Sequence, residues 1–286
     1  MKYLLVLLFS LPLLLQAQSG KVFDNLSLKS KILNMERKYA IYLPPDYETS
    51  QRSYPVLYLL HGSGDDQTGW VQFGEVQNIT DKAIKEGTST ALIIVMPDAN
   101  TGQRGYFNDI KGTWRYEDFF FQELMPFIEK TYRTKNEKRY RAISGLSMGG
   151  GGAFMYALHR PDLFAASCPL SASTGPISFD EVKAFNSRNP NSANLPDSVV
   201  SAFYNKISAH ALVNNMPDSV KKAVRWYIDI GDDDFLYEGN SLIHIAMKKK
   251  QIPHEFRIRE GGHSWSYWRS SLPSVLEFIS MSFRQH

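Results

Sequence analysis

The feature that most constrains the fold of this chain is Gly145-Leu146-Ser147-Met148-Gly149, a G-x-S-x-G motif. A short apolar run at 140–143 precedes it and a helix-like run at 148–158 follows it, so we predict a strand, a sharp turn and a helix. Such a turn presents the Ser147 hydroxyl at a helix N-terminus, and it requires the two glycines because crossing backbones leave no room for a Cβ. The motif is short enough to occur by chance, so its meaning depends on the rest of the chain.

The remaining sequence alternates strand-like and helix-like segments, which predicts an α/β fold with a mostly parallel sheet and helices on both faces. Continuous apolar runs of this length are typical of strands that are covered on both faces. The predicted buried strands are 55–60, 91–96, 140–143, 164–170 and 224–230, with a last strand at 255–259. The predicted long helices are 75–86, 117–132, 148–158, 239–249 and 272–283. Alternation of apolar and polar residues within 22–43 predicts an antiparallel pair at the start.

The chain has 286 residues, enough for one large α/β domain or two small ones. We predict a single domain over 22–286, with an insertion at 172–223 that is rich in Pro, Asn and Ser and too short for a strong core of its own. The net charge of +3 is small, and the longest basic run is Lys248-Lys249-Lys250. Nucleic acid is therefore not an expected partner.

The first residues resemble a secretion signal. Lys2 provides a positive start, 3–15 is an almost unbroken apolar run, and Ala17 is a small residue at a suitable cleavage point. An apolar run this short, interrupted by Pro12, cannot span a bilayer, so no stable membrane anchor is expected. We predict that 1–17 is a signal peptide and that the mature protein is periplasmic or secreted.

The chain contains one cysteine, Cys168, which cannot form an internal disulfide. It lies in the apolar run 164–170, so we predict a buried structural thiol and not a nucleophile. No cluster of potential metal ligands is evident in the sequence, so neither a metal site nor a cofactor is expected.

A serine hydroxyl is a weak nucleophile at neutral pH, and it needs an adjacent base that is oriented by a third group. In α/β-hydrolases the chain order is serine, acid, histidine. Of the seven histidines, His263 is the one that lies in a Gly-rich loop after the last predicted strand, so we predict that it is the base. The acid should follow the penultimate strand, where Asp232, Asp233 and Asp234 are consecutive. One of the three, backed by Phe235 and Leu236 packing inward, should reach His263. These positions alone do not decide which one.

The oxyanion formed when a serine attacks a carbonyl group needs two backbone N–H donors. Met148 supplies one, since it directly follows the nucleophile at a helix N-terminus. The second donor should come from the loop after the strand ending at Leu60, and Ser63 in His61-Gly62-Ser63-Gly64 is the expected donor. His61 is then a structural residue of that loop.

These pieces together resemble the esterase D-like family of α/β-hydrolases, which includes family 1 carbohydrate esterases such as feruloyl and acetyl xylan esterases, and tributyrin-type esterases. The matching segments are 59–64 with Trp70, 115–118, 145–150, 231–235 and 262–265, in family order. The resemblance implies the α/β-hydrolase fold and a serine triad, and it selects Asp234 as the acid. It also implies that Trp265 and Trp268 wall the acyl or leaving-group pocket, together with Trp70, although Trp268 fits a packing role equally well.

The expected function is that of a secreted serine carboxylic-ester hydrolase acting through an acyl-enzyme. The resemblance suggests acetyl or feruloyl esters of plant carbohydrates as substrates, either small molecules or oligosaccharides. One alternative is an acyltransferase of the mycolyltransferase type on the same fold. A second alternative, a non-catalytic binding protein, is disfavoured by the complete serine, acid and histidine order.

Overall fold

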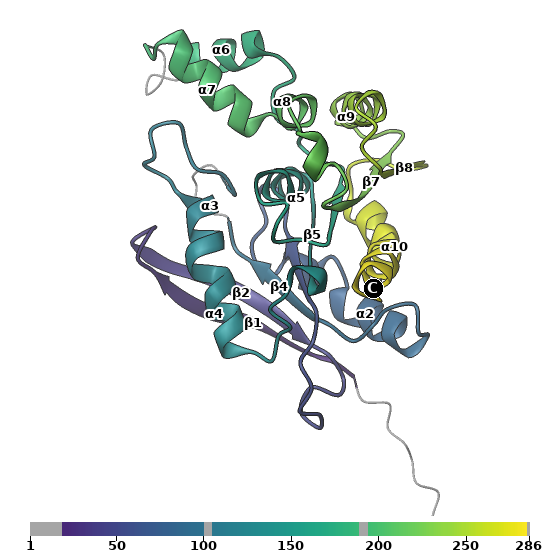
Figure 1. Cartoon of the computed structure of the whole chain (residues 1–286). Helices are drawn as coiled ribbons and strands as arrows, with labels where there is room; N and C mark the ends of the chain where they lie inside the picture. The colour runs from purple at the N-terminus through teal and green to yellow at the C-terminus, as the bar shows by residue number, and fades with distance from the viewer. Residues whose placement is uncertain (1–18, 100–104, 189–193, 285–286) are drawn as a thin grey trace, which may run out of the picture.

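A computed structural model describes residues 19–99, 105–188 and 194–284, so the predicted signal peptide at 1–17 lies outside the described residues. At its centre is an eight-stranded sheet in the order β1-β2-β4-β3-β5-β6-β7-β8 (Figure 1). The strands are β1 (Lys21–Ser30), β2 (Met35–Leu43), β3 (Val56–Leu60), β4 (Ile93–Pro97), β5 (Arg141–Leu146), β6 (Ala166–Leu170), β7 (Arg225–Gly231) and β8 (Glu255–Arg259).

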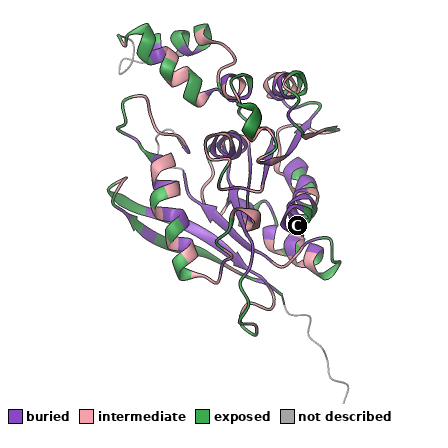
Figure 2. Ribbon diagram, viewed as in Figure 1, coloured by how far each residue is buried: buried purple, intermediate pink, exposed green. Residues whose placement is uncertain are grey.

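The sheet is mostly parallel, as the sequence predicts. β1 pairs antiparallel with β2, and β2 pairs antiparallel with β4. Every other neighbouring pair is parallel. The four central strands β4, β3, β5 and β6 are buried along their whole length, whereas the edge strands β1 and β8 are largely exposed or half-buried (Figure 2). Complete burial of central strands requires cover on both faces of the sheet.

Helices supply that cover on each face (Figure 1). They are α1 (Gly69–Gln72), α2 (Val76–Lys85), α3 (Tyr116–Phe119), the π-helical η1 (Phe120–Leu124), α4 (Met125–Thr131), the 3-10 helix η2 (Lys138–Tyr140), α5 (Met148–His159), α6 (Phe179–Ser187), α7 (Asp197–Ile207), α8 (Ala209–Asn214), the 3-10 helix η3 (Asp218–Val220), α9 (Tyr237–Lys249) and α10 (Trp265–Arg284). None of these helices combines the length and the apolar character that crossing a bilayer requires.

The two faces carry separate hydrophobic clusters. In β3, Tyr58 and Leu60 belong to the cluster that includes residues of α3, α5 and α9, whereas Leu57 and Leu59 belong to the cluster that includes residues of α2 and α10. This alternation follows from the period of two in a strand. Cys168, in the middle of β6, is fully buried on the α2 and α10 face, and burial raises the pKa of its thiol, as expected of a structural cysteine.

Two helices differ from their predicted form. The predicted helix at 117–132 contains the π-helical turn η1, which ends two residues before Pro126, whose nitrogen has no hydrogen to donate to the preceding turn. The final helix begins at Trp265 and not at Leu272, so the prediction started it seven residues late, and Pro273 lies inside it. Proline normally argues against a helix interior. Here the buried side chains Tyr267, Trp268, Ser271 and Leu272 hold the first two turns against the sheet.

The predicted insertion corresponds to α6, α7, α8 and η3, which lie between β6 and β7 in the chain and contribute no strand. In Figure 1, α6 and α7 lie at the periphery, and Figure 2 shows that much of their surface is exposed. α8 contacts α5 and α9 and buries Ala209, Ala211 and Val213. The insertion is therefore joined to the sheet's helical layer through α8.

Candidate active site

Ser147 lies at the turn between β5 and α5 with φ 54° and ψ −117°, a conformation that is costly for a residue with a side chain. The flanking glycines permit this turn. A Cβ on Gly145 would lie 2.5 Å from the backbone oxygen of Gly149, and a Cβ on Gly149 would lie 2.5 Å from that of His61. The backbone is therefore packed too closely for any other residue at either position.

A continuous hydrogen-bonded chain joins Ser147, His263 and Asp234. The Oγ of Ser147 lies 2.9 Å from Nε2 of His263. Nδ1 of His263 lies 2.9 Å and 3.1 Å from the two carboxylate oxygens of Asp234. Because an ionised carboxylate only accepts hydrogen bonds, Nδ1 carries the proton, which leaves Nε2 of the neutral ring to accept the serine proton. The three residues follow β5, β8 and β7, whose carboxyl ends meet at one edge of the sheet.

Asp234 is fully buried, whereas Asp232 and Asp233 are exposed. Burial raises the pKa of Asp234, but hydrogen bonds from His263, the Leu236 backbone and Ser171 outweigh it and hold the pKa below the ordinary value. Asp232 instead accepts a hydrogen bond from the Gly261 N–H at 2.9 Å, which ties the two loops together. Among the three consecutive acids, Asp234 is thus the one whose carboxylate contacts the imidazole.

The segments that carry the two predicted oxyanion donors both approach the serine. Met148 is the first residue of α5, so its N–H is one of the four that a helix leaves without an internal partner. The loop carrying Ser63 passes close by, since a Cβ on Gly62 would lie 3.5 Å from the Cβ of Ser147. The loop after β3 and the start of α5 therefore both lie next to Ser147.

His61 holds the loop that carries Ser63. Its Nε2 accepts a hydrogen bond from the Ala99 N–H at 2.9 Å, so Nδ1 carries the proton and donates to the Gly62 carbonyl at 2.8 Å. Burial lowers the pKa of His61 and favours this neutral form. Its backbone N–H donates to the Tyr106 hydroxyl at 2.9 Å. These contacts agree with the structural role expected for His61.

The three tryptophans proposed as pocket walls differ in exposure. Trp265 is half-buried. Trp70 is fully buried, packs edge-on against Trp265 with ring centroids 5.2 Å apart, and donates its indole N–H to the Leu60 carbonyl. The prediction that Trp70 contacts a substrate is therefore wrong for this conformation, because Trp70 instead supports Trp265. Trp268 is 5% exposed and packs edge-on against His263 at 4.9 Å, which favours the packing alternative.

One exposed aromatic side chain lies directly beside the hydrogen-bonded chain. Phe235 is 71% exposed, and its ring centroid lies 4.5 Å from that of His263. The sequence-based expectation that Phe235 packs inward behind the acid is therefore wrong. Phe73 is 48% exposed and lies 5.9 Å from Trp265, and Tyr237 is also exposed. Sequence analysis did not identify Phe73 and Tyr237, because isolated aromatics give no periodic signal.

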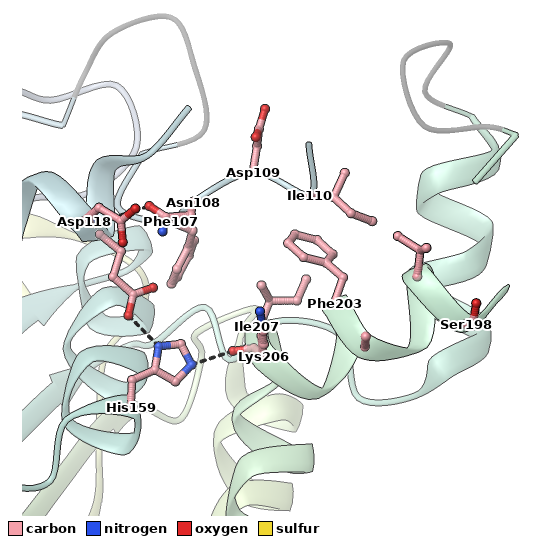
Figure 3. Close-up of a pocket in the computed structure, with 13 residues that line it drawn as sticks. Phe107, Asn108, Asp109, Ile110, Asp118, His159, Ser198, Phe203, Lys206 and Ile207 are labelled. Carbon is pink, nitrogen blue, oxygen red and sulfur yellow. Dashed lines mark hydrogen bonds and ion pairs between the residues drawn. The ribbon is translucent and has the colours of Figure 1, made fainter. Parts of the chain in front are cut away.

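A cavity lies away from these residues. It has a volume of about 710 Å³ and lies between the segment 107–110 and α7, with His159 at the end of α5 among its walls (Figure 3). Ser147, Asp234 and His263 do not line it. His159 contacts Glu117 at 2.6 Å through Nδ1 and the Lys206 carbonyl at 2.7 Å through Nε2. His159 is thus paired with a carboxylate and a carbonyl and not with a hydroxyl, in contrast to His263.

Comparison with known proteins identifies relatives of this chain. A family model named Esterase matches residues 30–279. A solved ferulic acid esterase is 36% identical with a TM-score of 0.81, and the match covers 93% of this chain and 99% of that one. An esterase of Mycobacterium tuberculosis is 38% identical over 48% of this chain and 29% of its own length. An endo-1,4-beta-xylanase/feruloyl esterase of Xylanibacter ruminicola is 37% identical over 47% of this chain and 19% of its own.

The matched part of this chain thus spans less than a third of the length of the last two relatives. The family match, in contrast, extends from β1 to α10 and includes the turn at Ser147 and the loops of Asp234 and His263. The chain therefore belongs to the Esterase family and has the α/β-hydrolase fold.

Proposed function

We propose that this protein is a serine carboxylic-ester hydrolase, with Ser147 as nucleophile, His263 as general base and Asp234 as the carboxylate that orients the imidazole. The observation that carries this proposal is the chain of short contacts from Ser147 Oγ through the imidazole to the buried Asp234 carboxylate. A hydroxyl held at a strained turn, next to a base with a fixed tautomer, is the arrangement that nucleophilic catalysis requires.

Each step then has a group to perform it. Ser147 Oγ attacks the ester carbonyl carbon while Nε2 of His263 takes the hydroxyl proton, and the Met148 and Ser63 N–H groups stabilise the oxyanion. The ionised Asp234 stabilises the imidazolium. Nε2 returns the proton to the leaving alcohol, and an acyl-enzyme remains. Water then attacks the acyl carbon, gives its proton to Nε2 and releases the carboxylic acid while Ser147 recovers its proton.

We further propose acetyl or hydroxycinnamoyl esters of plant carbohydrates as the substrates. The exposed ring of Phe235 beside His263, and the neighbouring rings of exposed Phe73 and half-buried Trp265, offer flat apolar surfaces for an aromatic acyl group or a sugar ring. Two of the relatives described above carry feruloyl or ferulic acid esterase in their names. Secretion through the segment 1–17 would place the enzyme where such carbohydrates occur.

A substrate panel with a matched inactive variant tests this function. Purified protein should hydrolyse p-nitrophenyl acetate and methyl ferulate or acetylated xylan, and should act weakly on p-nitrophenyl palmitate. Ser147→Ala should lose at least about three powers of ten in rate without unfolding, and a fluorophosphonate should label the native protein at Ser147 alone. Normal turnover by folded Ser147→Ala would refute the serine mechanism. Transfer of the acyl group to an added sugar in preference to water would instead support the acyltransferase.

The proposed export has its own test. Expression of the full chain in a bacterial host should yield a mature protein whose N-terminus lies just after Ala17, as shown by intact mass. Substitution of Leu7 by Arg, which interrupts the apolar run, should leave the protein unprocessed. An unprocessed wild-type protein that remains in the cytoplasm would contradict the proposed location.

A further inference from the structure

Asp229 is a fully buried carboxylate in β7, five residues before Asp234. Its side chain contacts α10 through the hydroxyl of Tyr267. A buried carboxylate is costly unless hydrogen-bond donors satisfy both of its oxygens. The donors around Asp229 therefore show which parts of the structure it holds together.

Three side chains donate to this carboxylate. The Tyr267 hydroxyl donates to Oδ1 of Asp229, and the Tyr227 hydroxyl donates to Oδ2 at 3.0 Å. Nη2 of Arg259 lies 2.9 Å from the same Oδ2 and forms an ion pair with it. Both oxygens of Asp229 thus have partners, and two of these partners come from other elements, β8 and α10.

The two partners from β8 and α10 lie on either side of His263 in the chain. Arg259 is the last residue of β8, and Tyr267 lies in the first turn of α10. His263 is four residues after Arg259 and four residues before Tyr267. The guanidinium of Arg259 also lies over the Tyr267 ring, 4.8 Å from its centroid. One carboxylate therefore holds both ends of the segment 259–267, which carries the proposed base.

The ring of Tyr267 also supports this segment directly. A Cβ on Gly261 would lie 2.6 Å from Cδ2 of Tyr267, so the backbone of Gly261 packs closely against the tyrosine ring. The N–H of Gly261 donates to Asp232 Oδ1 at 2.9 Å, and its carbonyl accepts from the Asp233 N–H at 3.1 Å. Tyr267 thus packs against the turn that leads to His263.

We infer that Asp229 is a positioning residue, which holds both ends of the segment 259–267 and so keeps the His263 imidazole in line with Ser147. This inference rests on the proposed serine mechanism. Asp229 does not touch the reacting atoms, and its effect passes through the two ends of the segment. If Asp229 only stabilised the fold, weakening its contacts would lower Tm and leave the turnover of the folded enzyme unchanged. The two roles therefore predict different kinetics.

Tyr267→Phe is the discriminating variant, because it removes one hydroxyl and keeps the ring that packs against Gly261. We expect kcat to fall about fivefold to tenfold with KM unchanged, since a poorly aligned base slows the chemical step and not binding. All rates should be compared at a temperature well below the Tm of the least stable variant. Unfolded protein then cannot imitate a loss of kcat.

Tyr227→Phe is the matched control. Tyr227 donates to the same carboxylate and is 5% exposed, compared with 4% for Tyr267, but it lies in β7 and outside the segment that carries His263. Both variants remove one buried hydrogen bond to Asp229, so their losses in Tm should be similar. The kcat of Tyr227→Phe should nevertheless remain within about twofold of the wild-type value.

Proton NMR gives a readout that does not depend on turnover. The hydrogen on Nδ1 of His263, which is bonded to Asp234, should give a downfield signal that is absent from His263→Gln. In Tyr267→Phe this signal should broaden, because a loosely held segment opens more often and lets the hydrogen exchange with water. Tyr227→Phe should keep the sharp signal.

Asp229→Asn tests the carboxylate itself. The amide keeps the shape of the side chain but does not balance the charge of Arg259, so kcat should fall at least as far as in Tyr267→Phe. The double variant should lose less than the product of the two single losses, because both changes weaken the same contact. A loss equal to that product would separate Tyr267 from Asp229 and overturn the inference.

Two further results would also overturn it. One is wild-type kcat together with a sharp downfield signal in folded Tyr267→Phe. The other is an equal loss of kcat in Tyr267→Phe and Tyr227→Phe. In either case, inactivity of Ser147→Ala would still support the serine mechanism, so failure of this inference is distinguishable from failure of the proposed function.

Discussion

Asp234 and Phe235 are consecutive in the chain, yet their side chains have opposite environments. Asp234 is fully buried, with its carboxylate on Nδ1 of His263, whereas Phe235 is 71% exposed and lies 4.5 Å from the same imidazole, measured between ring centroids. The short turn after β7 therefore provides His263 with a buried carboxylate partner, and it also places an exposed apolar ring beside the imidazole.

Phe235→Ala should weaken the binding of aromatic esters. Loss of a stacking surface should raise KM for methyl ferulate about threefold to tenfold and change KM for p-nitrophenyl acetate little, because the acetyl group offers no ring. Phe23→Ala is a suitable control, since Phe23 is 43% exposed on β1 at the opposite edge of the sheet. Equal losses for both esters would show that Phe235 acts on His263 and not on the acyl group.

Asp234→Asn should lower kcat by about four powers of ten, because an amide no longer fixes the imidazole tautomer or stabilises the imidazolium. Asp233→Asn, one position earlier and exposed, should retain near-normal kcat. Steady-state kinetics on p-nitrophenyl acetate measures both. If Asp233→Asn is the severely impaired variant, the assignment of the acid in this turn is wrong.

The acid side of the pH–rate profile should show a single ionisation. The imidazole must be neutral to accept the serine proton, so kcat/KM should rise as pH increases. Asp234 should not add a second ionisation in this range, because His263, Leu236 and Ser171 hold its pKa below the ordinary value despite its burial. Rates from pH 4 to 9 test this point, and a slope of two on the acid side would contradict it.

His159→Gln should cost more stability in acid than in base. Burial lowers the pKa of His159, but its contacts with Glu117 and the Lys206 carbonyl raise it overall. A raised folded-state pKa gives stability that is fully present below the unfolded-state value of about 6.5 and is lost as pH rises through the folded-state value. The loss in Tm should therefore be larger at pH 5.5 than at pH 8.5.

His210 provides an opposite control for that experiment. Burial in α8 lowers the pKa of His210. The contribution of His210 to stability is therefore present at pH values above its unfolded-state pKa and is lost as pH falls. His210→Gln should therefore relieve instability in acid, and its Tm relative to the wild type should change with pH in the reverse sense. Parallel pH dependences in the two variants would show that the ion pair with Glu117 is not responsible.

Local sequence patterns predicted much of the fold. The run at 255–259 is β8 with the same limits, and the helix after Ser147 ends one residue later than predicted. These elements are recognisable because apolar periodicity and the close-packed glycines leave a direct trace in the sequence. The position of His263 could also be inferred, because parallel strands bring their carboxyl ends to one edge.

The errors concern contacts between distant segments. The burial of Trp70 depends on Trp265, which lies far along the chain. The hydrogen bond from the Trp268 indole to the Ser171 hydroxyl likewise joins two segments that meet only after β6 and α10 have packed together. The spacing of residues along the chain does not reveal contacts between distant segments. The residues that pack around the triad could therefore not be predicted from the sequence.

The buried thiol of Cys168 can serve as a natural probe of unfolding in this enzyme. β6 lies between the strand that leads to Ser147 and the strand that leads to Asp234. Because Cys168 is fully inaccessible in the folded chain, a thiol reagent can modify it only while the centre of the sheet is open. Labelling rates in increasing denaturant, followed alongside ester turnover, would thus show whether the catalytic edge disassembles before the sheet or together with it.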